Sequence, residues 1–216
     1  MSVINDDSNH DYVAKVVLVG DSSVGKSNIL SRLLTNTFTD EKKPTLGVEF
    51  GSQLFNVNDK IIKIQIWDTS NKYYTAGQEK YKSITNSYYI NSKGALVVFD
   101  LSRQSSFNNV EKWLHDVKEV ADSSSIILVG NKNDLTELRQ VEQKEIDELK
   151  NKLGISYYET SALTGHNIKE VFQNLTELIY ENYLSKINLD EDEDFKNSQG
   201  FIKMTNQDSN KSKGCC

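Results

Sequence analysis

Residues 16–27 read Val-Val-Leu-Val-Gly-Asp-Ser-Ser-Val-Gly-Lys-Ser, an apolar run that passes directly into a loop with two glycines. From Gly20 onward the loop matches the pattern G-x-x-x-x-G-K-[ST]. The glycines let the backbone curl so that its N–H groups point at phosphate oxygens, and the following helix start adds its positive dipole end. We therefore predict a phosphate-binding loop between a buried strand and a helix, made of Gly20, Asp21, Ser22, Ser23, Val24, Gly25, Lys26 and Ser27. Asn28, directly after the loop, is a further expected nucleotide-binding residue.

Two side chains of this loop have expected roles. Lys26 should reach the β- and γ-phosphates of a nucleotide, and the Ser27 hydroxyl should ligate magnesium. A chance match in an ordinary strand–helix turn is the competing interpretation, and the strand before the loop and the helix after it argue against it. The loop alone leaves the base and the chemistry open, since an ATPase or a small-molecule kinase carries the same pattern.

Apolar runs and helical patterns alternate along the chain, which is typical of a parallel sheet flanked by helices. Continuous apolar runs at 16–19, 95–99 and 126–129 indicate strands buried on both faces. Residues 61–67 alternate between apolar and polar, and residues 48–57 are their expected antiparallel neighbour.

Two apolar stripes at three- and four-residue spacing predict amphipathic helices. One stripe runs from Ile168 to Ile179. The other belongs to a helix that opens at Ser105-Ser106 and carries Phe107, Val110, Trp113, Leu114 and Val117. We interpret both stripes as core rather than as a cofactor site.

The composition is that of one ordinary domain with flexible extensions. The 216 residues carry a net charge of −6, and this acidic balance argues against nucleic acid as the main partner, because phosphate backbones require clustered Lys and Arg. No stretch approaches the ~20 apolar residues of a membrane-spanning helix. The polar, acidic start of the chain is not a secretory signal.

The apolar pattern stops after about Leu184. An acidic run at 190–194 and a polar stretch follow, and such a segment buries too little apolar surface to offset its ordering entropy. We expect a flexible N-terminus at 1–11, a folded domain at 12–184 and a flexible tail at 185–216. Cys215 and Cys216 are the only cysteines. As neighbours they cannot cross-link the fold. They are either two incidental thiols at a frayed end or, in the interpretation that we favour, lipid attachment sites.

Polar residues that suit guanine follow the apolar run at 126–129. An Asp and an Asn three residues apart, as in Asn131-Lys132-Asn133-Asp134, can read this base, because the carboxylate accepts from the ring N–H and the exocyclic amine. Adenine lacks that donor pair. Taken alone, these residues are equally well explained as an ordinary polar turn. Together with the phosphate loop, and with Ser161-Ala162 after a later strand, they favour guanine.

At this point the chain resembles the small GTPases of the Ras superfamily, and their Rab branch in particular. The motifs that carry the resemblance, in the family's order, are Phe38, Thr45, Trp67-Asp68-Thr69, Ala76-Gly77-Gln78-Glu79, Asn131-Lys132-x-Asp134 and Glu159-Thr160-Ser161-Ala162. Three further features resemble the Rab branch: Gly47-Val48-Glu49-Phe50, Ile84-Thr85-x-x-Tyr88-Tyr89 and the terminal Cys-Cys. Within that branch, the sequence is most similar to the members of the recycling endosome. The resemblance covers residues 12–184 and the last two residues.

The resemblance implies an α/β fold with a single P-loop GTPase domain. Its sheet would be mostly parallel and six-stranded, with helices on both faces and one antiparallel edge strand. The resemblance also implies roles around the nucleotide. At the phosphates, Thr45 would close over magnesium and the γ-phosphate, and Asp68 would hold magnesium through water. At the base, Phe38 would pack on the guanine ring, and Asn131, Lys132 and Asp134 would read and cover the base. Ala162, next to Ser161, would donate its backbone N–H to the base carbonyl.

The implied reaction is hydrolysis of GTP to GDP and phosphate. Gln78 would orient the attacking water, while Lys26, magnesium and backbone N–H groups, including that of Gly77, would take the developing charge. No internal arginine finger is evident, because Arg32, Arg103 and Arg139 are expected to lie away from the phosphates. An activating protein would then supply the missing stabilisation.

The second switch departs from the family pattern. The family reads Asp-Thr-Ala-Gly-Gln without interruption, whereas residues 70–75 here separate Asp68-Thr69 from Ala76-Gly77-Gln78. A longer loop costs little closure entropy, but phosphoryl transfer depends on positioning. One alternative is therefore a guanine-nucleotide switch with impaired or absent hydrolysis because of the insert Ser70–Thr75. In the other, the insert bulges outward and leaves Gly77 and Gln78 in place.

A smaller departure lies in the phosphate loop. Ser23 stands where many Rab loops have glycine. Glycine tolerates backbone angles that strain other residues. The backbone at Ser23 is therefore a point to check for strain.

The biological role implied is a membrane-anchored GTP/GDP molecular switch that regulates vesicle trafficking. Cys215 and Cys216 resemble the doubly geranylgeranylated ending of Rab proteins, which places the protein on the cytoplasmic face of endomembranes, at the recycling endosome or trans-Golgi, with a cytosolic pool. The expected partners besides guanine nucleotide and magnesium are an exchange factor, an activating protein, a GDP-dissociation inhibitor and effectors. Phe50, Trp67 and Tyr88 match the aromatic set that Rab proteins present to effectors.

Overall fold

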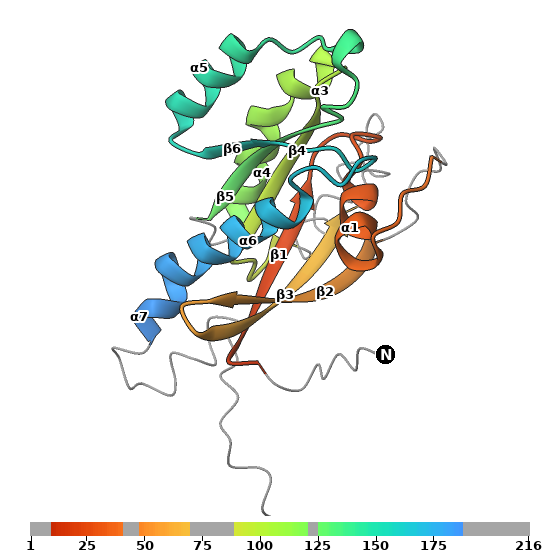
Figure 1. The fold of residues 1–216 in the computed structure, drawn as a ribbon. Helices are drawn as coiled ribbons and strands as arrows, with labels where there is room; N and C mark the ends of the chain where they lie inside the picture. Colours follow the sequence, from red (N-terminus) through yellow and green to blue (C-terminus); the bar gives the residue numbers. More distant parts are fainter. Residues whose placement is uncertain (1–9, 41–47, 70–88, 121–124, 188–216) are drawn as a thin grey trace, which may run out of the picture.

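The structure is a computed structural model that describes residues 10–40, 48–69, 89–120 and 125–187 (Figure 1). Within these residues six strands form one sheet in the order β2-β3-β1-β4-β5-β6. All neighbouring pairs are parallel except β2–β3, so β2 is an antiparallel edge strand. The predicted fold class is confirmed. The strands are β1 (Tyr12–Val19), β2 (Val48–Val57), β3 (Lys60–Thr69), β4 (Gly94–Asp100), β5 (Ile126–Asn131) and β6 (Ser156–Glu159).

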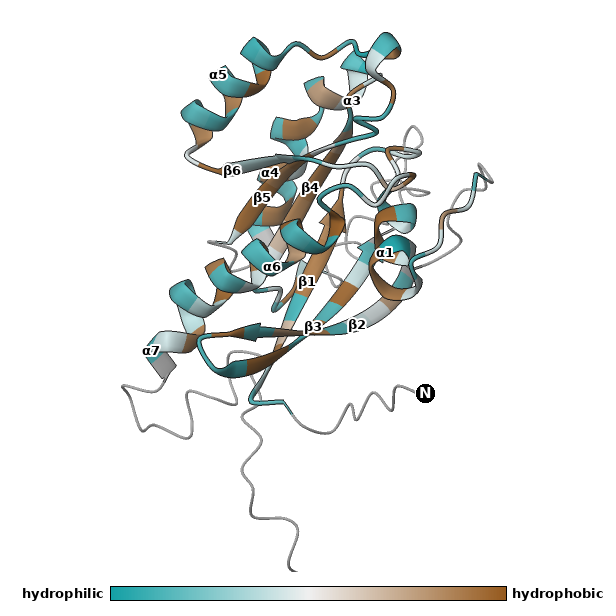
Figure 2. Cartoon of the chain, in the orientation of Figure 1, coloured by the Kyte–Doolittle hydropathy of each residue, from teal (hydrophilic) through white to brown (hydrophobic). Residues whose placement is uncertain are grey.

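Helices cover both faces of the sheet, because the central strands are apolar on each side. Figure 2 shows β1, β4 and β5 as largely hydrophobic, and every residue of β4 and β5 is buried. The helices are α1 (Lys26–Thr35), α3 (Gln104–Asn108), α4 (Val110–Val120), the 3₁₀ turn η3 (Thr136–Leu138), α5 (Gln143–Leu153), α6 (Ile168–Ile179), the π-helical η4 (Tyr180–Leu184) and α7 (Ser185–Ile187). Buried residues of α1 and α6 share one core cluster, and those of α3, α4 and α5 share the other.

The helix expected to open at Ser105-Ser106 is two helices. Helix α3 begins at Gln104, and the chain turns at Asn109 before α4 starts at Val110. The Asn109 side-chain amide donates to the Asp21 carboxylate at 2.9 Å, so the break brings a polar group to the phosphate loop. All five residues of the predicted stripe are nevertheless buried, as expected for core.

At the other end, α6 continues through η4 and α7 to Ile187, past the predicted domain limit at Leu184. None of the helices in the described segments is long and apolar enough to cross a bilayer.

The parallel strands end at one edge of the sheet, and the candidate site residues follow those ends. Leu18 of β1 pairs with Asp68 of β3, and Asp100 of β4 pairs with Asn131 of β5. Ligands of open α/β sheets bind outside the carboxyl ends of the strands. The register therefore brings the phosphate loop, Asp68 and the guanine motif to the same edge.

Candidate nucleotide-binding site

The phosphate loop needs both of its glycines. Gly20 has φ 141° and Gly25 has φ 101°, in the region that favours glycine. A Cβ on Gly20 would lie 2.0 Å from the Val98 carbonyl oxygen, and one on Gly25 would lie 2.3 Å from Asn131 Nδ2. Helix α1 begins at Lys26, directly after Gly25, so a helix follows the glycine turn as predicted.

The side chain of Lys26 is buried within the loop. Its ammonium donates to the carbonyl oxygens of Gly20 and Asp21, both at 2.8 Å, and the residue is only 6% exposed. Burial lowers the pKa of Lys26 to about 8, while the carboxylates of Asp68 and Asp21 act in the opposite direction. A buried cation is stabilised by an adjacent anion. Its position therefore suits a ligand that brings negative charge to this loop.

Ser23 is strained, as the departure from the family pattern suggested. Its φ is 64°, in the left-handed region, where a non-glycine residue costs roughly 1–2 kcal/mol. The two flanking carbonyls are each held by a side chain from elsewhere in the chain: Arg103 Nη2 donates to Ser22 O at 2.8 Å and Asn131 Nδ2 donates to Val24 O at 2.8 Å. These contacts hold the strained turn in place.

Arg103 contacts the backbone of the phosphate loop. The sequence placed this arginine away from the phosphates, and in the structure it donates to a carbonyl of the loop. Trp113 lies in the core, as expected, and its indole N–H also donates to the Asp21 carboxylate at 2.9 Å. A buried indole N–H needs an acceptor. From the sequence, this requirement was the only indication of the contact.

Ser27 and Asp68 could hold a divalent cation. The Ser27 hydroxyl donates to Asp68 Oδ2 at 2.5 Å, and the other carboxylate oxygen is buried with no hydrogen-bond partner among the described residues. Burial raises the pKa of Asp68, and the bond from Ser27 and the charge of Lys26 oppose that rise. Hydroxyl and carboxylate oxygens are the ligands that magnesium prefers. These residues fit the ion.

The guanine motif is a network of contacts within the protein. Asn131 is 1% exposed, and its Oδ1 accepts from Thr160 Oγ1 at 3.2 Å and from Ala162 N at 3.3 Å. Because its Nδ2 binds Val24, this one amide joins the phosphate loop to the loop after β6. The structure thus shows Asn131 organising the two loops, a role that the sequence prediction of base reading did not include.

The other two residues of the motif are held from neighbouring elements. Asp134 accepts from the Ser161 hydroxyl at 2.5 Å, and Lys132 forms a 2.6 Å ion pair with Asp100 at the end of β4. Lys132 has φ 66°, which turns the chain out of β5. The side chains predicted to read and cover the base are therefore anchored to the strand ends.

The segment that follows α1 carries Phe38. This ring is partly buried and packs against the core cluster that contains α1 and α6. Beyond it, the Asn28 amide donates to Thr39 O at 3.1 Å and its carbonyl accepts from Thr39 N at 3.4 Å. Asn28, predicted as a nucleotide-binding residue, ties this segment back to α1.

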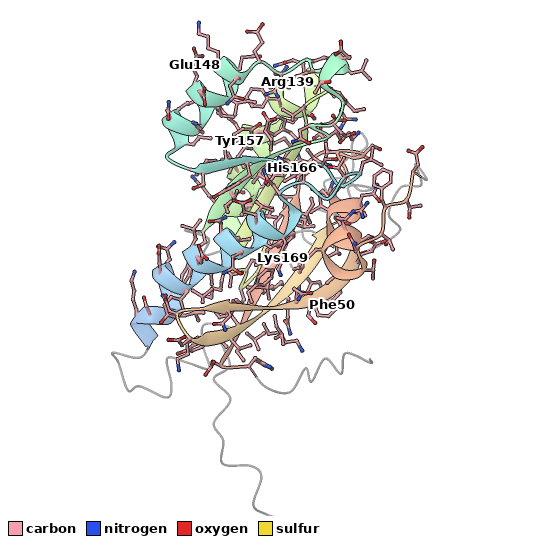
Figure 3. The ribbon with its side chains drawn as sticks, viewed as in Figure 1. Phe50, Arg139, Glu148, Tyr157, His166 and Lys169 are labelled. Atoms are coloured by element: carbon pink, nitrogen blue, oxygen red, sulfur yellow. The ribbon has the colours of Figure 1, made fainter. Side chains whose placement is uncertain are left out.

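An aromatic surface lies on β2 and β3. Phe50, labelled in Figure 3, is 54% exposed and meets Trp67 edge-on, with ring centroids 5.2 Å apart. The Lys15 ammonium lies 5.0 Å from the Trp67 ring and donates to Ile90 O at 3.0 Å. Ile90 is itself 48% exposed. Sequence reasoning missed Lys15 and Ile90, which no motif marked.

Several predicted residues lie outside the described part of the chain. They are Thr45, the insert Ser70–Thr75, Gly77, Gln78, Tyr88, Cys215 and Cys216. Their roles stay predictions.

Comparison with known proteins decides between the remaining classes of P-loop protein. A family model described as the Ras family matches residues 15–181. The chain belongs to the Ras family. Among its plant relatives, the Ras-related protein Rab2BV of Beta vulgaris is 42% identical over 214 residues, RABA2b of Arabidopsis thaliana is 43% identical over 214 residues, and Rab11C of Lotus japonicus is 43% identical over 216 residues. Each match covers 97% of this chain and 97% of the relative.

The identification as a Rab of the recycling-endosome branch is confirmed by these relatives. The prediction of GTPase activity is confirmed with it, and the chain is a small GTPase switch of vesicle trafficking. A P-loop ATPase or kinase is thereby set aside. Guanine-nucleotide binding, and control by regulators and effectors in general, follow from membership of the family.

We predict that Gly25→Ala weakens GDP binding at least tenfold, measured by fluorescence titration with excess magnesium. The added methyl would displace the Asn131 amide, 2.3 Å away, and so loosen the bond between the phosphate loop and the guanine motif. Gly154→Ala is the matched control, since Gly154 also has positive φ, at 63°, but nothing lies within 4 Å of its Cβ position. This control should lose about 1 kcal/mol of stability and keep its affinity for GDP. Equal loss of affinity in both variants would contradict the explanation.

Proposed function

We propose that this Rab is a membrane-anchored GTP/GDP switch that binds its nucleotide with magnesium at the sheet edge described above. The observation that carries the proposal is the Asn131 amide, which binds the phosphate loop through Nδ2 and Thr160, in the loop that carries Ala162, through Oδ1. Phosphate and base recognition are thereby held at a fixed separation. A nucleotide is the ligand that requires both at once.

Each part of the nucleotide has residues to meet it. The backbone N–H groups of residues 20–27 and the start of α1 would surround the phosphates, with Lys26 supplying positive charge. Asp134 would accept from the guanine N–H and amine, Ala162 N would donate to its carbonyl, and Phe38 and Lys132 would cover the ring. Magnesium, held by Ser27, Asp68 and Thr45, would neutralise phosphate charge. This arrangement positions the γ-phosphate for attack by water.

Purified full-length protein should retain GTP and GDP at micromolar concentrations when magnesium is present. ATP should not compete, because adenine offers Asp134 no pair of donors. The measurement is competition against a fluorescent GDP, with Asp134→Asn as the variant that loses guanine preference. Failure to retain either guanine nucleotide would overturn the proposed site.

Hydrolysis depends on Gly77 and Gln78, which follow the insert. The N–H of Gly77 would bind the γ-phosphate, and Gln78 would orient the attacking water. Asp68 is fixed by β3 and buried, so it serves the site whatever the insert does. We propose that the insert Ser70–Thr75 reduces hydrolysis while leaving nucleotide binding intact, because positioning controls phosphoryl transfer and loop length barely affects folding.

Deletion of residues 70–75 should therefore raise the single-turnover rate of GTP hydrolysis markedly. Affinity for GDP should stay within about twofold, since the guanine motif and the phosphate loop are untouched. The rate is measured on preloaded protein by phosphate release. Equal rates with and without the insert would show that it bulges outward and leaves Gly77 and Gln78 in place.

We propose that two prenyl chains on Cys215 and Cys216 anchor the protein to the cytoplasmic face of endomembranes, at the recycling endosome or trans-Golgi. Lipid burial contributes about 0.8 kcal/mol per CH₂, and two chains suffice where one is marginal. Lys211 and Lys213 are too few for a polybasic anchor, and the acidic run at 190–194 is repelled by an anionic leaflet. The lipids must then supply the binding.

Replacing both cysteines with serine should make the protein cytosolic. The expected result in cell fractionation is loss from the membrane pellet, with GDP affinity unchanged because the site lies in the folded domain. Replacing Lys211 and Lys213 with serine is the control and should leave the protein on membranes. Persistent membrane association of the double-serine variant would contradict lipid anchoring.

The expected partners are an exchange factor, an activating protein, a GDP-dissociation inhibitor and effectors. For effectors we propose the aromatic surface of Phe50 and Trp67, completed by Tyr88. Phe50 is exposed and Trp67 is partly buried beneath it, and aromatic residues at a surface are typical of interface anchors. Loss of the γ-phosphate would release Thr45 and Gly77 and so weaken effector binding.

A further inference from the structure

Arg32 links two parts of the chain that are far apart in sequence. It lies in the last turn of α1, and its Nε donates to Ala162 O at 2.8 Å while its Nη2 donates to Leu163 O at 2.7 Å. The fork of the guanidinium thus meets two successive carbonyls of the loop after β6. The sequence had placed this arginine away from the phosphates and assigned it no role at the base.

The guanidinium is held in place before it meets that loop. Its Nη1 donates to Asn36 O at 2.8 Å and to Asn36 Oδ1 at 3.1 Å. Asn36 caps α1 in the left-handed conformation, with φ 53° and its N–H bound to Arg32 O. A planar fork fixed on one side loses little further entropy when it binds on the other.

The turn that contains Ala162 is closed by contacts of Ser161. The Ser161 hydroxyl accepts from Thr164 N at 3.0 Å, and Ser161 O accepts from Gly165 N at 2.8 Å, so both contacts close the turn on itself. Toward the guanine motif, the Ser161 hydroxyl donates to Asp134 at 2.5 Å, and Ala162 N reaches Asn131 Oδ1 at 3.3 Å. The two bonds from Arg32 therefore hold the peptides that follow Ala162 against the body of the domain.

We propose that Arg32 is a positioning residue for guanine recognition. The Ser161 O–Gly165 N bond closes residues 161–165 into one turn. By fixing the carbonyls of Ala162 and Leu163 to the end of α1, Arg32 places this turn, and with it the Ala162 N–H, the group assigned above to the base carbonyl. This inference rests on the proposed nucleotide site. It predicts that Arg32 acts on one contact, to the base carbonyl, rather than on nucleotide binding as a whole.

Two nucleotides distinguish an effect on the contact to the base carbonyl from an effect on nucleotide binding as a whole. GDP carries the base carbonyl, whereas 2-aminopurine riboside diphosphate keeps the exocyclic amine and the phosphates but lacks that carbonyl and the ring N–H next to it. Each variant is therefore compared with the wild type on the same nucleotide, so that the lost N–H affects both proteins alike. In full-length protein with magnesium, Arg32→Met should weaken GDP binding about fivefold to tenfold, the loss typical of one hydrogen bond. Binding of the 2-aminopurine nucleotide should change less than twofold. Arg32→Lys, which keeps the charge but loses the fork, should lie between the wild type and Arg32→Met for GDP.

The control is Lys152→Met, which removes a cation of α5 that pairs with Glu111 of α4 at 2.8 Å, outside the nucleotide site. It should leave both affinities unchanged. If the wild type bound no GDP, the proposed function would fail and this inference with it. If the wild type bound GDP while Arg32→Met and Arg32→Lys weakened both nucleotides equally, or neither, the inference alone would be overturned.

Discussion

The site depends on the hydrogen bonds of one buried group, the side-chain amide of Asn131. It lies at the end of β5, and it donates to the phosphate loop at Val24 and accepts from the loop that carries Ala162. A buried amide with one partner missing is costly, so both loops are favoured in the positions that satisfy it. The sheet supplies the fixed point, because β5 is buried along its whole length.

The same amide helps to hold Ser23 in a backbone conformation that favours glycine. Ser23 is left-handed, and the carbonyl on each side of it is bound from elsewhere, by Arg103 before it and by Asn131 after it. In a planar trans peptide the C=O and the next N–H point in opposite directions. Holding these carbonyls therefore fixes the opposite direction of the N–H groups of Ser23 and Gly25. The surrounding contacts over-determine a strained turn, as is usual at binding sites.

The sheet, the phosphate loop and the family were predictable because each leaves a local pattern: continuous apolar runs for β4 and β5, and fixed glycine spacing for the loop. The contacts of Arg32 and Arg103 leave none, since both donate to backbone carbonyls and any residue supplies a carbonyl. The break at Asn109 was missed for a related reason: the apolar stripe continues through it, and only the distant Asp21 explains the turn. Local patterns reveal elements, whereas contacts between distant backbone groups appear only in the folded chain.

The same contacts bear on how hydrolysis is completed. The chain has three arginines, and in the structure all three bind groups of the protein itself. Arg139 pairs with Glu159, and Arg32 holds the base loop. Arg103 is the one that touches the phosphate loop, but it binds a carbonyl, and the N–H of the same peptide points away from it. It therefore lies on the side of this peptide opposite to the Ser23 N–H, one of the amides that would meet phosphate. This supports an arginine supplied in trans by an activating protein, a contribution of roughly 10³–10⁵ in rate for GTPases.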